Sequence, residues 1–252
     1  MHQIASGGDT SYTHLNAVCP WVEALRPDEV AAANALPAPR VLKTHLMPDA
    51  IPPVHGRLLY IVRDPRDVAL SLYHHALGFQ TFDGSLGHFR RYLAEGYAYY
   101  GNFATWPAHV NAWAAAAKRA PPGTVLVLRY EDLIADLPGC LSRIAAFCGL
   151  PLPDQLREEI LPRLSLAYMR EHTARFDYSW HDPESSERFQ FFRIGRAGGW
   201  DTEGDPARWL QFAQHMAAQL TPEARAFFPT LSLPLIPRVA PESESAAGLD
   251  IA

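Results

Sequence analysis

Arg63 and Ser71 lie eight positions apart, where an apolar stretch gives way to an amphipathic one. Arg63 stands at the end of R-L-L-Y-I-V-R-D (57–64), and Ser71 follows two helical turns later. An arginine fork and a helical hydroxyl that face one crevice can bind an oxyanion or a phosphate, because both donate hydrogen bonds. The alternative is an arginine paired with Asp64 or Asp67 and a serine on a solvated helix face.

Lys43 and His45 stand two positions apart in K-T-H-L. In an extended segment such residues point to the same side, so the ammonium and the imidazole can converge on one reacting centre. Histidine has an ordinary pKa of about 6.5 and can act as a base at neutral pH. The alternative is a half-buried histidine beside a surface lysine.

The segment F-F-R-I-G-R-A-G-G-W (191–200) combines two arginines with three glycines. Such a loop is cationic and flexible, and its backbone N–H groups can approach a phosphate closely. An ordinary surface turn is the alternative.

Three apolar segments, 40–45, 57–64 and 124–132, are predicted to be strands that position these residues. A helix is expected to begin at Pro65, since proline suits the first helical position. The other expected helices cover residues 21–25, 86–93, 106–119, 138–148, 154–160, 165–171, 206–219 and 222–228. Strands that alternate with helices predict an α/β fold, a parallel sheet with helices on both faces. Ligands of such sheets bind outside the carboxyl ends of the strands.

The composition is that of a folded protein, with 48% hydrophobic and 19% charged residues among 252. The net charge of −5 argues against a bulk electrostatic nucleic-acid binder. Apolar runs are too short for a membrane span, and the first residues do not resemble a signal peptide. We expect one domain over residues 1–235 and a flexible tail over 236–252.

The cysteines, Cys19, Cys140 and Cys148, match no zinc-binding spacing. We interpret them as reduced thiols, which favours a cytoplasmic protein without a metal site.

In order and spacing, these segments resemble the cytosolic-type sulfotransferases, which transfer a sulfonate from 3′-phosphoadenosine-5′-phosphosulfate (PAPS) to a hydroxyl or amine. K-T-H-L resembles the family's catalytic strand end, and Y-I-V-R-D-P-R-D-V-A-L-S (60–71) resembles its 3′-phosphate motif. T-W-P-A-H-V-N-A-W (105–113) resembles a third conserved helix of the family, L-R-Y-E-D-L (128–133) its adenine-side strand, and R-I-G-R-A-G-G-W (193–200) its C-terminal loop R-K-G-x-x-G-D-W. The resemblance covers roughly residues 1–220 and implies a P-loop-NTPase-like parallel sheet.

The resemblance implies a role for each matching residue. His45 would be the general base on the acceptor, and Lys43 would stabilise negative charge near the transferring group. Tyr130 would lie against the adenine, flanked by residues 164–169. The residues that would bind PAP, the product nucleotide, are Arg63, Ser71, Tyr130, Arg193, Ile194 and Gly195.

The chain also departs from the family. Its 5′-phosphosulfate loop, P-K-S-G-T-T-W, is absent from the 252 residues, together with the strand before it. Ile194 and Gly199 replace the usual lysine and aspartate. The family's dimer motif is not recognisable, so no oligomeric state is predicted. We therefore expect residues 1–252 alone to be marginally stable and to transfer little sulfonate.

Two functions follow from the resemblance: sulfonate transfer from PAPS to a small acceptor, or PAP binding without catalysis. An unrelated nucleotide enzyme such as a kinase is disfavoured, because no G-x-x-x-x-G-K-[ST] occurs. An apolar alcohol or phenol is the predicted acceptor, and no nucleic acid is expected as a partner. The aromatic residues that would line its pocket are Phe79, Phe82, Phe89, Tyr97, Tyr99, Tyr100 and Phe103.

Overall fold

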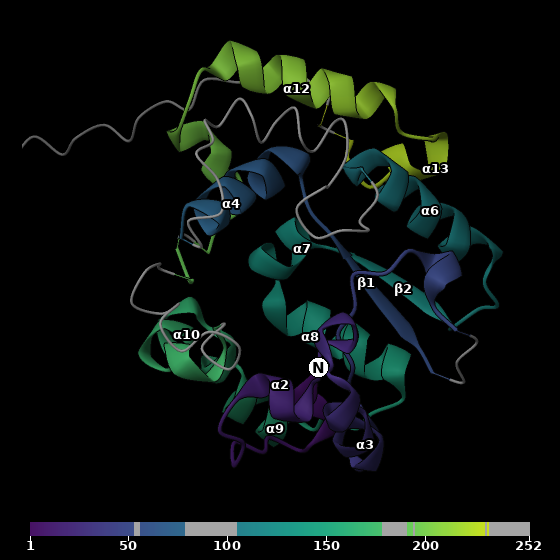
Figure 1. Ribbon diagram of the computed structural model, residues 1–252, viewed down its shortest axis with the longest axis vertical. Helices are drawn as coiled ribbons and strands as arrows, with labels where there is room; N and C mark the ends of the chain where they lie inside the picture. Colours follow the sequence, from purple (N-terminus) through teal and green to yellow (C-terminus); the bar gives the residue numbers. More distant parts are fainter. Residues whose placement is uncertain (53–55, 79–104, 178–190, 194, 230, 232–252) are drawn as a thin grey trace, which may run out of the picture.

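The computed structural model describes residues 1–52, 56–78, 105–177, 191–193, 195–229 and 231 (Figure 1). Strand β1 (Leu58–Val62) pairs in parallel with β2 (Val125–Arg129), and Val62 is the register partner of Arg129. Two of the three predicted strands are therefore present. The predicted helix at 86–93 and the predicted tail at 236–252 lie outside the described residues.

The prediction of a strand at 40–45 is wrong. Only Lys43 forms a bridge, opposite Trp21: its N–H donates to the Pro20 carbonyl and its carbonyl accepts from the Val22 N–H, both at 2.9 Å. An apolar pattern does not reveal whether a neighbouring strand is available for pairing. In the part of the chain that the structure describes, no strand lies beside this segment. Leu42 is 52% exposed, so the segment is not the buried strand that its composition favoured.

The even-numbered residues of β1 face a cluster of four helices. These are α4 (Pro65–Gly78), α6 (Trp106–Arg119), α12 (Pro206–Ala218) and α13 (Pro222–Arg225), which lie above the sheet in Figure 1. Tyr60 and Val62 are buried there against residues such as Trp113 and Trp209. The apolar stripes of these helices lie against the sheet because burying them removes hydrocarbon from water.

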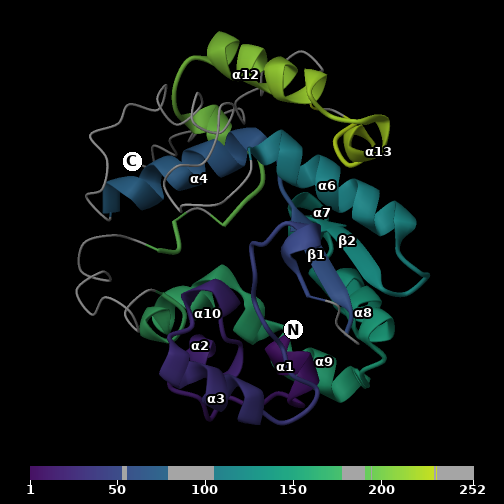
Figure 2. The ribbon, with the colours of Figure 1, turned by 45° about the vertical axis from the view of Figure 1, so that its right-hand side comes forward.

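The other face of the sheet carries a second cluster. Leu59 of β1 and Leu128 of β2 pack there with Ile4, Ile144 and Ile160. These isoleucines belong to α1 (His2–Ala5), α8 (Leu137–Cys148) and α9 (Asp154–Ile160), below the sheet in Figures 1 and 2. Helices thus cover both faces, as predicted for an α/β fold, because successive strand residues point to opposite sides.

β2 ends three residues earlier than predicted. Tyr130 begins α7 (Tyr130–Ala135), which turns the chain away at the carboxyl edge of the sheet. The remaining helices are α2 (Leu15–Val18), α3 (Pro27–Ala35) and α10 (Leu166–Glu171), with short 3₁₀ turns at Val22–Ala24, Pro48–Ala50, Pro162–Leu164, Thr173–Arg175 and Gly199–Thr202. Among the described residues, no helix is long and apolar enough to cross a bilayer.

Candidate functional site

Arg63 lies at the carboxyl edge of the sheet, between β1 and α4. Its guanidinium lies over the ring of Tyr130, 4.3 Å from the ring centre. Val62 and Arg129 are register partners, so the next residue of each strand reaches the same place. The contact is a cation–π interaction. The structure therefore brings together two of the residues predicted to bind the nucleotide.

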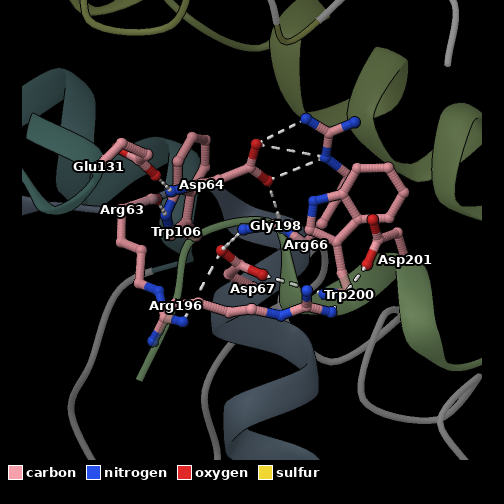
Figure 3. A network of polar contacts seen from close by, with 10 residues as sticks. All are labelled: Arg63, Asp64, Arg66, Asp67, Trp106, Glu131, Arg196, Gly198, Trp200 and Asp201. Atoms are coloured by element: carbon pink, nitrogen blue, oxygen red, sulfur yellow. Dashed lines mark hydrogen bonds and ion pairs between the residues drawn. The ribbon is translucent and has the colours of Figure 1, made fainter. Parts of the chain in front are cut away.

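Asp67, the third residue of α4, joins Arg63 to the glycine-rich loop (Figure 3). Its buried carboxylate lies 3.7 Å from the Arg63 guanidinium. It also accepts hydrogen bonds from the backbone N–H groups of Gly198, at 2.8 Å, and Trp200, at 3.1 Å. Burial raises the pKa of Asp67, and the Arg63 charge and the two backbone bonds oppose that rise. The pairing considered as an alternative for Arg63 is thus present.

A second ion pair braces the same corner. Arg66 is buried and holds Asp64 by two parallel contacts, Nε to Oδ1 at 3.0 Å and Nη2 to Oδ2 at 2.6 Å. The Arg66 guanidinium also lies 4.1 Å from the centre of the Trp200 ring (Figure 3). The backbone N–H of Asp64 donates to Glu131, which follows β2. The start of α4 is therefore tied to both the loop and the end of β2.

The first half of the loop lies against α10. Gly195 has a φ of +65°, and a Cβ built on it would lie 2.6 Å from a methyl carbon of Leu166. Only glycine fits this backbone without strain. Arg170 of α10 donates to the carbonyl oxygens of Phe192, at 3.0 Å, and Arg193. The loop and the segment expected to flank the base are therefore in contact. Ile194 lies outside the described residues.

The side chain of Arg193 is paired within the protein. Its Nη1 lies 3.1 Å from Oε1 of Glu203, which also contacts Nε2 of His74 at 2.8 Å. His74 lies on α4 one turn after Ser71, whose side chain is exposed. Residues three apart on a helix are neighbours, so this chain of contacts brings Arg193 to the helix face that carries Ser71.

Lys43 and His45 meet on the ring of Trp21. The Lys43 ammonium lies 4.8 Å from that ring's centre, and the His45 ring contacts it edge-on at 5.2 Å. His45 keeps an exposed surface, yet enough protein surrounds its ring that desolvation, followed by the Lys43 charge, lowers its pKa to about 4. Glu23 opposes that shift. His45 is therefore neutral at neutral pH, as a general base must be.

His109 of α6 connects the backbone of His45 to the core. Its Nε2 lies 3.1 Å from the His45 carbonyl oxygen, and its Nδ1 lies 3.1 Å from the Tyr60 hydroxyl. A carbonyl only accepts, so Nε2 carries the proton and Nδ1 accepts from Tyr60 in the neutral ring. Trp113, stacked on Tyr60, donates to the carbonyl of Leu46 at 3.3 Å. These contacts hold the segment that lacks strand pairing.

Within the described part of the chain, no group of three or more histidine, cysteine or acidic residues could hold a metal ion. The aromatic residues predicted to line an acceptor pocket, Phe79 to Phe103, all lie outside the described residues.

Comparison with protein families matches residues 4–224 to the family described as "Sulfotransferase domain". The chain belongs to the sulfotransferase domain family. Mouse sulfotransferase 2B1 is 28% identical over 210 residues, covering 78% of this chain and 59% of the relative. Rat sulfotransferase 1C2 is 28% identical over 169 residues, covering 65% of this chain and 55% of the relative. The chain thus spans less than two thirds of the length of these two sulfotransferases.

A solved structure has the same fold. Retinol dehydratase in a complex with retinol and PAP superposes with a TM-score of 0.62 at 26% identity, covering 82% of this chain and 65% of that one. The predicted parallel sheet with helices on both faces is therefore the architecture of a sulfotransferase-family domain.

Several contact residues of the site, among them Asp67, His109, Arg170 and Glu203, have no binding or catalytic role in the sequence-based prediction. Asp67 was considered only as a partner that would occupy Arg63, and His109 only as part of a helix-like segment. Arg170 and Glu203 carried no signal. Glu203 contacts His74 across 129 positions of sequence, and nothing in the composition of either segment indicates that contact.

Proposed function

We propose that this domain binds PAPS at the carboxyl edge of its sheet and transfers the sulfonate to a hydroxyl or amine, releasing PAP. The observation that carries the proposal is the linkage of Arg63 to Tyr130 and, through Asp67, to the glycine-rich loop. Together these elements offer a guanidinium, an aromatic face and backbone N–H groups to a phosphorylated nucleoside.

His45 and Lys43 supply the proposed chemistry. The neutral His45 ring accepts the proton of the acceptor hydroxyl while its oxygen attacks sulfur. The bond between sulfur and the bridging 5′-phosphate oxygen breaks, and its electron pair leaves with PAP. The Lys43 ammonium, which shares the Trp21 ring with His45, stabilises charge on the transferring group.

For the acceptor we propose an apolar alcohol or phenol. The similar retinol dehydratase was solved in a complex with PAP and with retinol, an apolar alcohol. The sequence of this chain is rich in aromatic residues between positions 79 and 103, and aromatic side chains are common in pockets for apolar ligands. The three free cysteines fit a reducing compartment, and we propose the cytoplasm.

Calorimetry of PAP binding tests the nucleotide site. Arg63→Ala should weaken PAP binding by about 2–4 kcal/mol, or roughly 30-fold to 1000-fold, because a charge-assisted contact is lost. Arg208→Ala, which removes a guanidinium that is 69% exposed, is the matched control and should bind like the parent. Unchanged PAP affinity in a folded Arg63→Ala variant would remove Arg63 from the site.

Transfer of radiolabelled sulfonate to a panel of alcohols, phenols and amines tests the reaction. His45→Ala should reduce the rate by about 100-fold or more while PAP affinity stays unchanged, because only proton transfer is affected. Equal turnover of variant and parent would exclude His45 as the base.

Binding of PAP without transfer is the second candidate function. The contacts of Arg63 with Tyr130 and Asp67 would serve the binding of PAP whether or not transfer follows. A parent protein that binds PAP but transfers no label in the same panel would favour this candidate. The same assay tests the prediction that residues 1–252 alone transfer little sulfonate.

A further inference from the structure

We infer that Asp67 is a positioning residue that fixes the two halves of the nucleotide site relative to each other. One half is Arg63 with Tyr130 at the strand ends, and the other is the glycine-rich loop. The inference rests on the proposed function, because it assigns a role to Asp67 in the binding of PAP.

The Asp67 carboxylate contacts both halves of the proposed nucleotide site. The Asp67 side chain is 1% exposed, and each of its oxygens accepts a backbone N–H of the loop. Oδ2, which accepts from Gly198, is also the oxygen near Arg63. Asp67 is therefore the one residue among those drawn in Figure 3 that contacts both Arg63 and the backbone of the loop.

A buried carboxylate is costly unless charge and hydrogen bonds compensate for its desolvation. Here the compensating groups are parts of the proposed site, so the site and the carboxylate hold each other in place. Arg63 lies between the Tyr130 ring and Asp67, which restricts its guanidinium to a narrow range of orientations. A preorganised guanidinium loses less side-chain entropy when it binds an anion.

The same contacts decide which loop N–H groups can face a ligand. The N–H groups of Gly198 and Trp200 are occupied by Asp67, so they are directed into the protein. We therefore place the N–H groups that would face a phosphate in the earlier part of the loop, around Gly195, whose backbone lies against Leu166. Asp67 thus sets the distance between that part and Arg63.

Asp67→Asn tests the inference with little change in volume. An amide can accept at its oxygen but donates at its nitrogen, so one loop N–H would face another donor. We expect PAP to bind about 10-fold to 100-fold more weakly, the range for one buried group left unpaired. Trypsin should also cleave after Arg196 about tenfold faster without PAP, because local opening exposes the loop. Asp28→Asn, an equal charge change at an aspartate of α3 whose side chain is 77% exposed, is the control and should behave like the parent.

A purely structural role for Asp67 would lower the melting temperature and leave the PAP affinity of the folded variant unchanged. That result, or trypsin cleavage at the rate of the parent, overturns the inference. If Asp67→Asn does not fold, amide hydrogen exchange on the unaltered protein decides. The amides of Gly198 and Trp200 should be protected before PAP is added, and exchange as fast as an exposed loop overturns the inference. A parent that fails to bind PAP at all instead refutes the proposed function.

Discussion

His109 makes one hydrogen bond to the His45 carbonyl and one to the Tyr60 hydroxyl, and His109→Phe removes both while keeping an aromatic ring on α6. The substitution leaves the Tyr60 hydroxyl and the His45 carbonyl without the imidazole. The two groups differ in what replaces the lost partner. Tyr60 is only 9% exposed, so water cannot easily reach its hydroxyl. His45 lies at the surface, where water can replace the ring.

The magnitude follows from this difference. An unpaired buried hydroxyl costs about 1–3 kcal/mol, and an exposed hydrogen bond contributes about 0.5–1.5 kcal/mol. We therefore expect His109→Phe to lower the free energy of unfolding by about 2–4 kcal/mol. For a chain of this size, that change lowers the melting temperature by roughly 5–15 °C.

Thermal melts of four proteins measure the effect. They are the parent, His109→Phe, Tyr60→Phe and the double variant, in which both polar partners are gone. The double variant should be more stable than the sum of the single losses allows, with a coupling of about 0.5–3 kcal/mol. His215→Phe, a substitution at an exposed histidine of α12, is the control and should melt with the parent. A His109→Phe variant that melts within about 2 °C of the parent, or single losses that simply add, would refute the reasoning.

Two further predictions concern charge. Burial lowers the pKa of His45 and of His75 to about 4, so between there and the unfolded value of about 6.5 the unfolded chain binds more protons. The free energy of unfolding should therefore fall as pH is lowered through that range, and urea denaturation of the parent and His45→Gln should show a smaller slope in the variant. Glu203→Gln removes a carboxylate that competes with phosphate for Arg193, and PAP should bind about two- to fivefold tighter by calorimetry. Weaker binding would show that Glu203 instead holds Arg193 in place.

The fold was predictable where one segment carries its own signal. The bounds of α6 and α9 match the prediction, because a clear apolar stripe or a flanking proline defines each. α3 was missed because only Ala33 of that alanine-rich helix is buried, so no stripe exists to detect. The prediction of a strand at 40–45 was wrong although the apolar signal was present. A strand also needs a neighbouring strand to pair with, and the residues of one segment do not show whether a neighbour exists.

The candidate site was predictable to a similar depth. The ends of two strands must meet at one edge of a parallel sheet, which is why the proximity of Arg63 and Tyr130 could be anticipated. The contacts of Asp67 could not, because their donors are backbone N–H groups 131 and 133 positions away. Every residue but proline has such a group, so its position leaves no trace in residue type.

The register of β1 against β2 fixes the relative positions of the site residues that follow the two strands. Alternate residues of both strands are sorted between two apolar clusters, and sliding one strand by a single position would send each side chain to the wrong cluster. The same slide would separate Arg63 from Tyr130, which follow Val62 and Arg129 directly. One inserted residue in the middle of β1 should therefore abolish the cation–π contact, so the packing of the two apolar clusters also fixes the distance between the Arg63 guanidinium and the Tyr130 ring.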